Sequence, residues 1–315
     1  MNKPLYVIGL DGGGTKTTGI LCSFDGAILA EAHGGPSNFQ VIGVEQAAKT
    51  IIDVVQSCCR TIGCSPEEIG ATAAGLTGAG RPHDQQRMAD GILEEARARQ
   101  IGLSNVSVES DARIALEGAF GGKPGIIVIA GTGSIVFGKD RRGTVHRAGG
   151  WGRLIGDEGS GYAIGREAFR AVARVIDGRG GRTKLLKLFQ TKLELDTQEA
   201  IIEALYRKNF DMASAAPLVI EAAADGDRTA RHILGVAKDE LLEVITAAFV
   251  RLSRSGRRAA PLPLAFVGSL LTNDNVYSRS LRAAIKRTLP QVSLQQAESS
   301  PVVGAALLAI SRVSQ

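Results

Sequence analysis

The chain has 315 residues, 44% of them hydrophobic and 22% charged, an ordinary balance for a globular protein large enough for two domains. Aromatic residues make up only 4% and the net charge is a modest +5, which argues against nucleic acid as a partner. No apolar run reaches membrane-spanning length and no signal-peptide pattern opens the sequence. We therefore expect a cytoplasmic protein without a membrane partner.

The four cysteines all lie early in the chain, at Cys22, Cys58, Cys59 and Cys64. They lack Cys-x-x-Cys spacing, and no histidine stands near them in metal-ligand register. This pattern predicts free, buried thiols rather than a zinc site or an iron–sulfur cluster.

A glycine-rich loop follows the first predicted strand, residues 5–8. It reads Asp11-Gly12-Gly13-Gly14-Thr15-Lys16. Consecutive glycines leave backbone N–H groups free to face a bound phosphate. Asp11 offers a carboxylate for hydrated Mg²⁺, and the residues after the glycines offer donors to phosphate oxygens. The alternative interpretation is a β-hairpin whose glycines only reverse the chain.

Two familiar phosphate motifs do not match this loop. A Walker A motif requires Gly-Lys-Ser/Thr at its end, whereas here Thr15 precedes Lys16. A Rossmann fingerprint opens a helix, whereas residues 17–24 are predicted to form a second strand, turned at Asp25-Gly26 into a third strand over 27–30. The sequence thus predicts a strand–loop–strand phosphate site.

Helices and strands alternate in the following segment. An apolar stripe predicts a helix over Val44–Ile62, ended by Gly63, and a strand follows over Ile69–Leu76. A charged helix over 84–100 and a strand over 105–109 come next, and Asp111 stands just beyond that strand. The alternation predicts an α/β domain with a mixed sheet. By position alone, Asp111 suits an N-cap for the helix from Ala112.

The pattern then begins again. A strand over 125–130 runs into a second loop, Gly131-Thr132-Gly133-Ser134, and a further strand over 135–138. The repeat suggests two related domains that face one another across a cleft, although any two glycine-rich hairpins would look alike.

The rest of the chain is mainly helical. Six glycines between Gly149 and Gly161 predict an ordered loop before a helix over 162–176. Residues 184–255 have helical periodicity and form an all-α insertion. The sheet resumes over 264–267, ending at Gly268-Ser269, and a helix over 276–288, a strand over 292–296 and a helix from Pro301 follow.

Taken together, these motifs resemble one family. Those that carry the resemblance are Asp11-Gly-Gly-Gly-Thr15, Ala130-Gly-Thr-Gly-Ser134, Gly149-Gly-Trp-Gly152, Gly156-Asp-Glu-Gly159 and Val267-Gly-Ser269. In this order they are similar to the N-acetylglucosamine kinases, within the BadF/BadG/BcrA/BcrD-type ATPases and the superfamily of actin, heat-shock chaperones and sugar kinases. The resemblance implies an α/β fold of two ribonuclease-H-like (actin-like ATPase) domains, 1–114 and 115–315, each with a mixed sheet. The helical insertion at about 184–255 belongs to the second domain, and the two domains close over sugar and ATP.

The resemblance also implies roles in nucleotide binding. The two glycine loops would hold the phosphates, Gly268 and Ser269 would lie beside the adenosine, and Asp11 would hold Mg²⁺ through water. The implied ATP-binding residues are Gly12, Gly13, Gly14, Thr15, Lys16, Gly131, Thr132, Gly133, Gly268 and Ser269.

For catalysis, the resemblance favours Asp111 as the base that accepts the proton of the sugar hydroxyl, over its interpretation as an N-cap. Sugar recognition would fall to Asn38 and Asp157, with Glu158 either a second sugar ligand or the group that orients Asp157. Trp151 would stack on the sugar or simply belong to the core. The implied sugar-binding residues are Asn38, Ser134, Gly150, Trp151, Gly152, Asp157 and Glu158.

The predicted function is ATP-dependent phosphorylation of an amino sugar, first N-acetylglucosamine to its 6-phosphate, with glucosamine as the alternative substrate. A hypothesis from another class is a nucleotide-switched activator ATPase that acts on a protein partner. The activators that carry an iron–sulfur cluster use cysteines near the start of the second domain, and this chain has none after Cys64. The helix-rich second domain favours a homodimer.

Overall fold

The computed structural model describes residues 5–253 and 261–313. By its internal contacts the chain divides into two units, residues 1–123 with 296–315, and residues 124–295. Among the described residues, no helix is long and apolar enough to cross a membrane.

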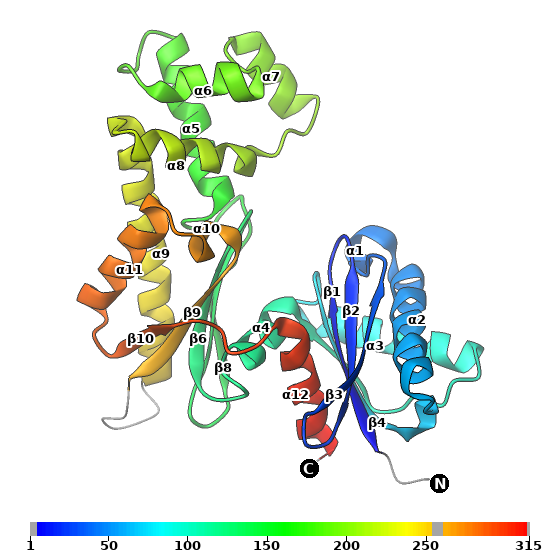
Figure 1. The fold of residues 1–315 in the computed structure, drawn as a ribbon. Coiled ribbons are helices and arrows are strands. Elements are labelled where there is room, and N and C mark those ends of the chain that lie inside the picture. Colours follow the sequence, from blue (N-terminus) through cyan, green and yellow to red (C-terminus); the bar gives the residue numbers. More distant parts are fainter. Residues whose placement is uncertain (1–4, 254–260, 314–315) are drawn as a thin grey trace. The chain divides into compact units, whose positions relative to one another are not determined.

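The first unit is built on a mixed five-stranded sheet with the order β3-β2-β1-β4-β5 (Figure 1). Its strands are β1 (Tyr6–Gly12), β2 (Thr17–Ser23), β3 (Ile28–Gly34), β4 (Ile69–Leu76) and β5 (Val106–Ser110). The first three strands pair antiparallel, whereas β1, β4 and β5 run parallel. The carboxyl ends of these three parallel strands therefore meet at one edge of the sheet.

Helices cover both faces of this sheet. The elements are α1 (Phe39–Ile42), α2 (Val44–Ile62), the 3₁₀ turn η1 (Pro66–Glu68), α3 (Pro82–Ala98), α4 (Asp111–Ala119) and α12 (Pro301–Val313). Alternate residues of β1 face opposite sides: Ile8 joins the core with α2 and α3, and Val7 joins the one with α12. A Cβ on Gly9 would collide with the α12 backbone at Ala306, so this glycine allows close packing of the helix.

The second unit repeats this topology with the order β10-β9-β6-β7-β8. Its strands are β6 (Gly125–Ala130), β7 (Ser134–Lys139), β8 (Val145–Gly149), β9 (Leu262–Val267) and β10 (Val292–Gln295). Again the first three strands, β6, β7 and β8, pair antiparallel, whereas β9 pairs in parallel with β6 and β10 pairs in parallel with β9. The predicted duplication is thus confirmed, with β8 as a strand that the sequence does not predict.

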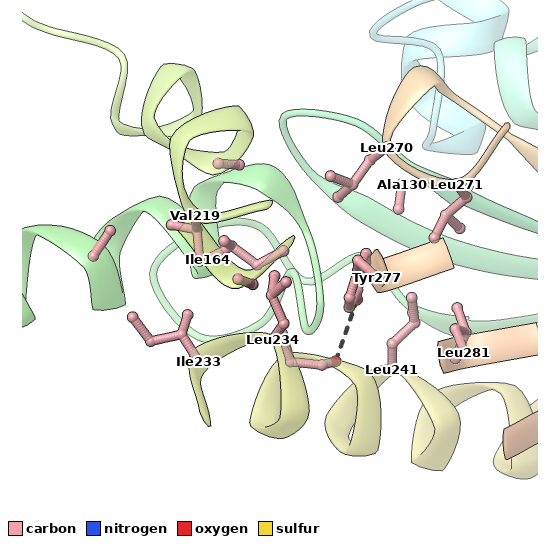
Figure 2. Close-up of a cluster of buried hydrophobic side chains, with 14 of the residues drawn as sticks. Ala130, Ile164, Val219, Ile233, Leu234, Leu241, Leu270, Leu271, Tyr277 and Leu281 are labelled. Atoms are coloured by element: carbon pink, nitrogen blue, oxygen red, sulfur yellow. Dashed lines mark hydrogen bonds between the residues drawn. The ribbon is translucent and has the colours of Figure 1, made fainter. Parts of the chain in front are cut away.

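Helices of the second unit pack around a large core (Figure 2). They are α5 (Gly161–Ile176), α6 (Lys184–Leu193), α7 (Gln198–Tyr206), η2 (Met212–Ala215), α8 (Ala216–Ala224), α9 (Arg228–Ser253), α10 (Ser269–Thr272) and α11 (Val276–Thr288). The fully buried Tyr277 donates its hydroxyl proton toward two carbonyls, at 2.8 Å to Gly159 and 3.4 Å to Ala237. This side chain ties the glycine-rich loop before α5 to α9.

Two features differ in detail from the sequence prediction. The division between the units lies after residue 123 rather than after 114, and α12 returns to the first unit, because α4 and α12 pack together over its sheet. Their approach is close: a Cβ on Gly304 would collide with the backbone of Ile114 and Gly118.

The cysteines are free thiols; Cys22, Cys58 and Cys59 are buried and Cys64 is half-buried.

Candidate functional site

Three polar side chains of the first unit gather at the carboxyl edge of the parallel strands. The register aligns Gly12 of β1 with Leu76 of β4, and Leu76 with Ser110 of β5. Asp11 therefore lies at the end of β1, Thr77 directly after β4 and Asp111 directly after β5. The topology brings together residues that are 34 to 100 positions apart because parallel strands end at the same edge.

Asp111 is exposed, but its carboxylate is oriented by two hydrogen bonds. The backbone N–H of Ala112 donates to Oδ1 at 2.8 Å, and the Thr77 hydroxyl donates to Oδ2 at 3.0 Å. The N-cap of α4 is Ser110, whose Oγ accepts from the N–H of Arg113 at 3.1 Å. The interpretation of Asp111 as the N-cap is therefore wrong. Thr77 is not among the predicted site residues, although its position directly after the predicted strand Ile69–Leu76 is the kind of place that indicates one.

Asp11 is the more buried of the two carboxylates. Burial, followed by the nearby negative charge of Asp111, raises the pKa of Asp11, and Lys16 opposes this shift. Two carboxylates that repel one another favour a cation between them. Within the described ranges, no cluster of three or more His, Cys, Asp or Glu suited to a metal ion is found. Asp11, the more buried carboxylate, would fit Mg²⁺, which keeps several of its waters in proteins.

The glycines of the first loop differ in whether the surrounding structure has space for a side chain. A Cβ on Gly12 would collide with Ser37 and Leu76, so packing requires this residue. A Cβ on Gly14 would meet nothing within 4 Å, and no glycine of the loop has a positive φ. Gly14, Thr15 and Lys16 are exposed. The fold therefore does not need a glycine at position 14, and a residue without a side chain there would allow the close approach of a ligand.

Asn38 lies against this loop. The N–H groups of Ser37 and Asn38 both donate to the carbonyl of Gly13, at 2.9 and 3.1 Å. The Oδ1 atom of Asn38 caps α1 by accepting from the N–H of Gln40 at 3.2 Å. The first unit thus brings together Asn38, the glycine loop and the two aspartates.

The second unit joins its own glycine loop to Asp157 and Glu158. The backbone N–H of Ser134 donates to Oδ1 of Asp157 at 3.3 Å, and the Ser134 hydroxyl donates to the carbonyl of Glu158 at 2.7 Å. Asp157 is buried with a left-handed φ of 63°. Burial raises the pKa of Asp157, Glu158 raises it further, and the Ser134 N–H lowers it. A buried carboxylate with one weak partner is suited to accept hydrogen bonds from a polar ligand.

The start of α5 holds the same loop from the other side. The N–H groups of Gly161 and Tyr162 donate to the carbonyls of Gly131 and Thr132, at 2.8 and 3.0 Å. These two hydrogen bonds tie the loop to the start of α5.

A cavity of about 450 Å³ connects this loop to the segment after β9. Gly131, Thr132 and Ser269 line it together, as the resemblance implies for a nucleotide site. Gly268 has a φ of 93° and its Cβ would collide with the Ala130 carbonyl, so its role is in the backbone turn. Several polar and apolar residues that the motifs do not indicate also line this cavity, from the N-cap of η2, η2 itself, α8 and the segment before α11. They are Asp211, Ser214, Pro217, Ile220, Asn273 and Asn275.

The loop around Trp151 is open. Gly149, Gly150 and Gly152 all have positive φ values between 67° and 87°, and the Trp151 side chain is 71% exposed. Its interpretation as a core residue is therefore wrong. Trp151 and Glu158 line a second cavity of about 600 Å³, and Oε2 of Glu158 is buried without a hydrogen-bond partner among the described residues.

Two relatives that match almost the whole chain are named as kinases of amino sugars. It is 34% identical over 308 residues to the N-acetylmuramic acid/N-acetylglucosamine kinase of Clostridium acetobutylicum, covering 96% of this chain and 98% of that one. It is 32% identical to the N-acetyl-D-glucosamine kinase of Dictyostelium discoideum, covering 98% and 99%. A solved Chromobacterium violaceum structure, provisionally assigned as an N-acetylglucosamine kinase, superposes with a TM-score of 0.69 at 28% identity, covering 97% and 99%.

This likeness confirms the predicted two-domain fold of the sugar kinases and actin-like ATPases. The model of the BadF/BadG/BcrA/BcrD ATPase family matches residues 8–309, nearly the whole chain. The chain belongs to the BadF/BadG/BcrA/BcrD ATPase family.

Proposed function

We propose that this protein is an ATP-dependent sugar kinase that phosphorylates an amino sugar, with N-acetylglucosamine as the first candidate substrate. Relatives that match almost the whole chain are named as kinases of N-acetylglucosamine, and one of them also of N-acetylmuramic acid. The observation that carries the proposal is the exposed carboxylate of Asp111, oriented by Thr77 at the carboxyl edge of the first sheet.

In the proposed reaction, Asp111 acts as general base. Its carboxylate accepts the proton of the sugar C6 hydroxyl while that oxygen forms a bond to the γ-phosphorus of ATP and the bond to the β-phosphate oxygen breaks. ADP and the sugar 6-phosphate are the products. Phosphoryl transfer depends mainly on positioning and on neutralising charge, so one oriented carboxylate is enough as the base when loop donors and a metal ion neutralise the phosphates.

The proposed phosphate contacts are the backbone N–H groups of the two glycine loops, with Thr15, Lys16 and Thr132 as further donors. Ser269 shares the cavity of about 450 Å³ with the second loop and is proposed to lie beside the adenosine. Asp11 is proposed to hold Mg²⁺, which would neutralise phosphate charge when bound. The assignment is supported by the concentration of negative charge at this edge, where burial and then the Asp111 carboxylate raise the pKa of Asp11.

Sugar recognition is proposed for Asn38 in the first unit and Asp157 in the second. Asp157 is buried and accepts one long hydrogen bond, at 3.3 Å, from the residues that the structure describes, so a sugar hydroxyl would satisfy its remaining acceptor capacity. Ser134, Gly150, Trp151 and Gly152 complete the proposed contact set. Glu158 is proposed as a positioning residue, since its carbonyl holds the Ser134 hydroxyl.

The decisive test is a panel of hexoses assayed by coupled ADP release. N-acetylglucosamine, N-acetylmuramic acid, glucosamine and glucose should be compared at saturating ATP and Mg²⁺. The proposal expects ADP formation that depends on the sugar and is greatest with an amino sugar. Slow ATP hydrolysis that no sugar changes would instead favour the activator hypothesis, which the named relatives do not support.

Two further assignments are predictions that accompany this proposal. We propose a cytoplasmic location and a homodimer. Light scattering after size-exclusion chromatography would settle the oligomeric state.

A further inference from the structure

A third cavity of the second unit, of about 350 Å³, lies between α5 and α9 and is lined by arginines. Arg170 and Arg174 come from α5, Arg179 from the turn after it, and His232 from α9. None of these residues lines the cavity around Gly131 and Ser269. Its size is at the lower end of small-molecule sites, which excludes a large ligand.

The three guanidinium groups differ in how they are engaged. Arg170 pairs with Glu167 at 3.0 Å, and Arg179 pairs with Asp177 at 2.6 Å. All four partners are substantially exposed, and ion pairs of this kind contribute little to stability, so either arginine can turn to a ligand. In the part of the chain that the structure describes, no hydrogen bond or ion pair engages the Arg174 side chain.

Positive charge exceeds negative charge at this cavity. Three arginines line it against one carboxylate, Glu167, while Asp177 neutralises Arg179 from outside the lining. Thr229 adds a hydroxyl donor, whereas the Thr183 hydroxyl donates its only proton to the Asp227 carboxylate at 3.0 Å. The cavity is therefore suited to an anion with several acceptor oxygens.

We propose that this arginine cavity is a second ligand site, which binds the phosphate group of a small phosphorylated molecule. Guanidinium groups present a planar fork of donors that matches phosphate oxygens, and Arg174 is free to make such a contact. The turn at Gly180-Gly181 leaves room beside it, since a Cβ on Gly181 would meet nothing within 4 Å. The site is independent of the proposed kinase reaction.

The cavity shares α5 with the second glycine loop. The first residue of α5, Gly161, donates to the carbonyl of Gly131, and the last turns of the same helix carry Arg170 and Arg174. A ligand that links these arginines to α9 would therefore contact α5, the helix whose first residues are hydrogen-bonded to the second glycine loop. If the kinase reaction is confirmed, the KM for ATP gives a second readout of this connection, while the binding test below does not depend on it.

The test is isothermal titration calorimetry of the full chain with inorganic phosphate and with glucose 6-phosphate, using glucose as the control. We expect saturable binding of a phosphate-bearing probe that is about tenfold weaker or worse in Arg174→Ala and in Arg170→Ala. Arg174→Lys should lie between, because it keeps the charge but loses the fork. Arg207→Ala removes an exposed arginine that does not line the cavity and should bind as the wild type does.

Tighter binding of glucose 6-phosphate than of phosphate would identify a phosphomonoester as the ligand, and equal binding would identify free phosphate. The proposal is overturned if neither inorganic phosphate nor glucose 6-phosphate gives a saturable heat of binding. It is also overturned by equal affinity in wild type and Arg174→Ala, or by equal weakening in Arg207→Ala. Circular dichroism of each variant confirms that the comparison is made on folded protein.

Discussion

The hydroxyl of Thr77 donates a hydrogen bond to Oδ2 of Asp111 at 3.0 Å, across the ends of two neighbouring parallel strands. The other carboxylate oxygen is held by the N–H of Ala112. Asp111 is thereby fixed in direction while its side chain stays exposed, which is the condition that a base accepting a substrate proton requires.

Replacing Asp111 by Asn should lower kcat by about 100-fold or more, because a positioned general base contributes on that order. Nucleotide binding should stay close to wild type, since Asp111 lies outside the glycine loops. Asp90→Asn, an exposed carboxylate on α3, is the matched control. Coupled ADP release and nucleotide titration measure the two effects, and full turnover in Asp111→Asn would rule out its role as base.

Replacing Thr77 by Val removes the hydroxyl that orients Asp111 and should lower kcat by about tenfold, the value of one hydrogen bond to a charged group. Thr77→Ser keeps the hydroxyl and should restore most of the activity. The KM for ATP should not change in either variant. If Val and Ser lower kcat equally, the hydroxyl has no positioning role.

The first loop offers a matched pair of glycines. Gly12→Ala should destabilise the fold by about 1–3 kcal/mol, since its Cβ collides with Ser37 and Leu76. Gly14→Ala should unfold as the wild type does in urea, because its Cβ has open space. The KM for ATP should nevertheless rise in Gly14→Ala. An unchanged KM there would remove the phosphate-binding role of this glycine.

Asp11 predicts a pH dependence of stability with a definite sign. Burial and Asp111 raise its pKa above the ordinary 3.8, so between 3.8 and the raised value the folded state binds more protons than the unfolded state. Its contribution to stability therefore falls as the pH rises through that window and stays low above it.

The isosteric Asp11→Asn variant should avoid this loss. Measured by urea unfolding without metal, its stability relative to wild type should improve as the pH rises above 3.8 and then level off. Addition of Mg²⁺ with nucleotide should stabilise wild type more than Asp11→Asn. Equal stabilisation of both proteins would argue against Asp11 as the metal residue.

Replacing Trp151 by Ala should change the free energy of unfolding by no more than about 0.5 kcal/mol, because the side chain is 71% exposed. The KM for the sugar should rise if this ring stacks on the sugar face. A large loss of stability with an unchanged sugar KM would assign Trp151 to packing.

Regular elements with a complete buried face could be predicted from the sequence. The helix Val44–Ile62 and the strand Ile69–Leu76 have the predicted bounds, and Gly63 ends the helix in a left-handed conformation. The edge strand β8 could not be predicted from the sequence. None of its residues is fully buried, so it lacks an alternating pattern of apolar and polar residues. The division after residue 123 escaped prediction because it depends on packing between α4 and α12, which are far apart in the chain.

By itself, the sequence determined the order of the motifs, the duplicated strand–loop–strand plan and the residue types of each loop, since these depend on local periodicity and glycine content. Only the tertiary structure decided which polar groups meet. Thr77 reaches Asp111, and Ser134 reaches Asp157, because parallel pairing and the loop before α5 bring distant segments together. It also separated the glycine required by packing, Gly12, from Gly14, which packing does not require. The space around a Cβ is a property of neighbours that local sequence does not contain.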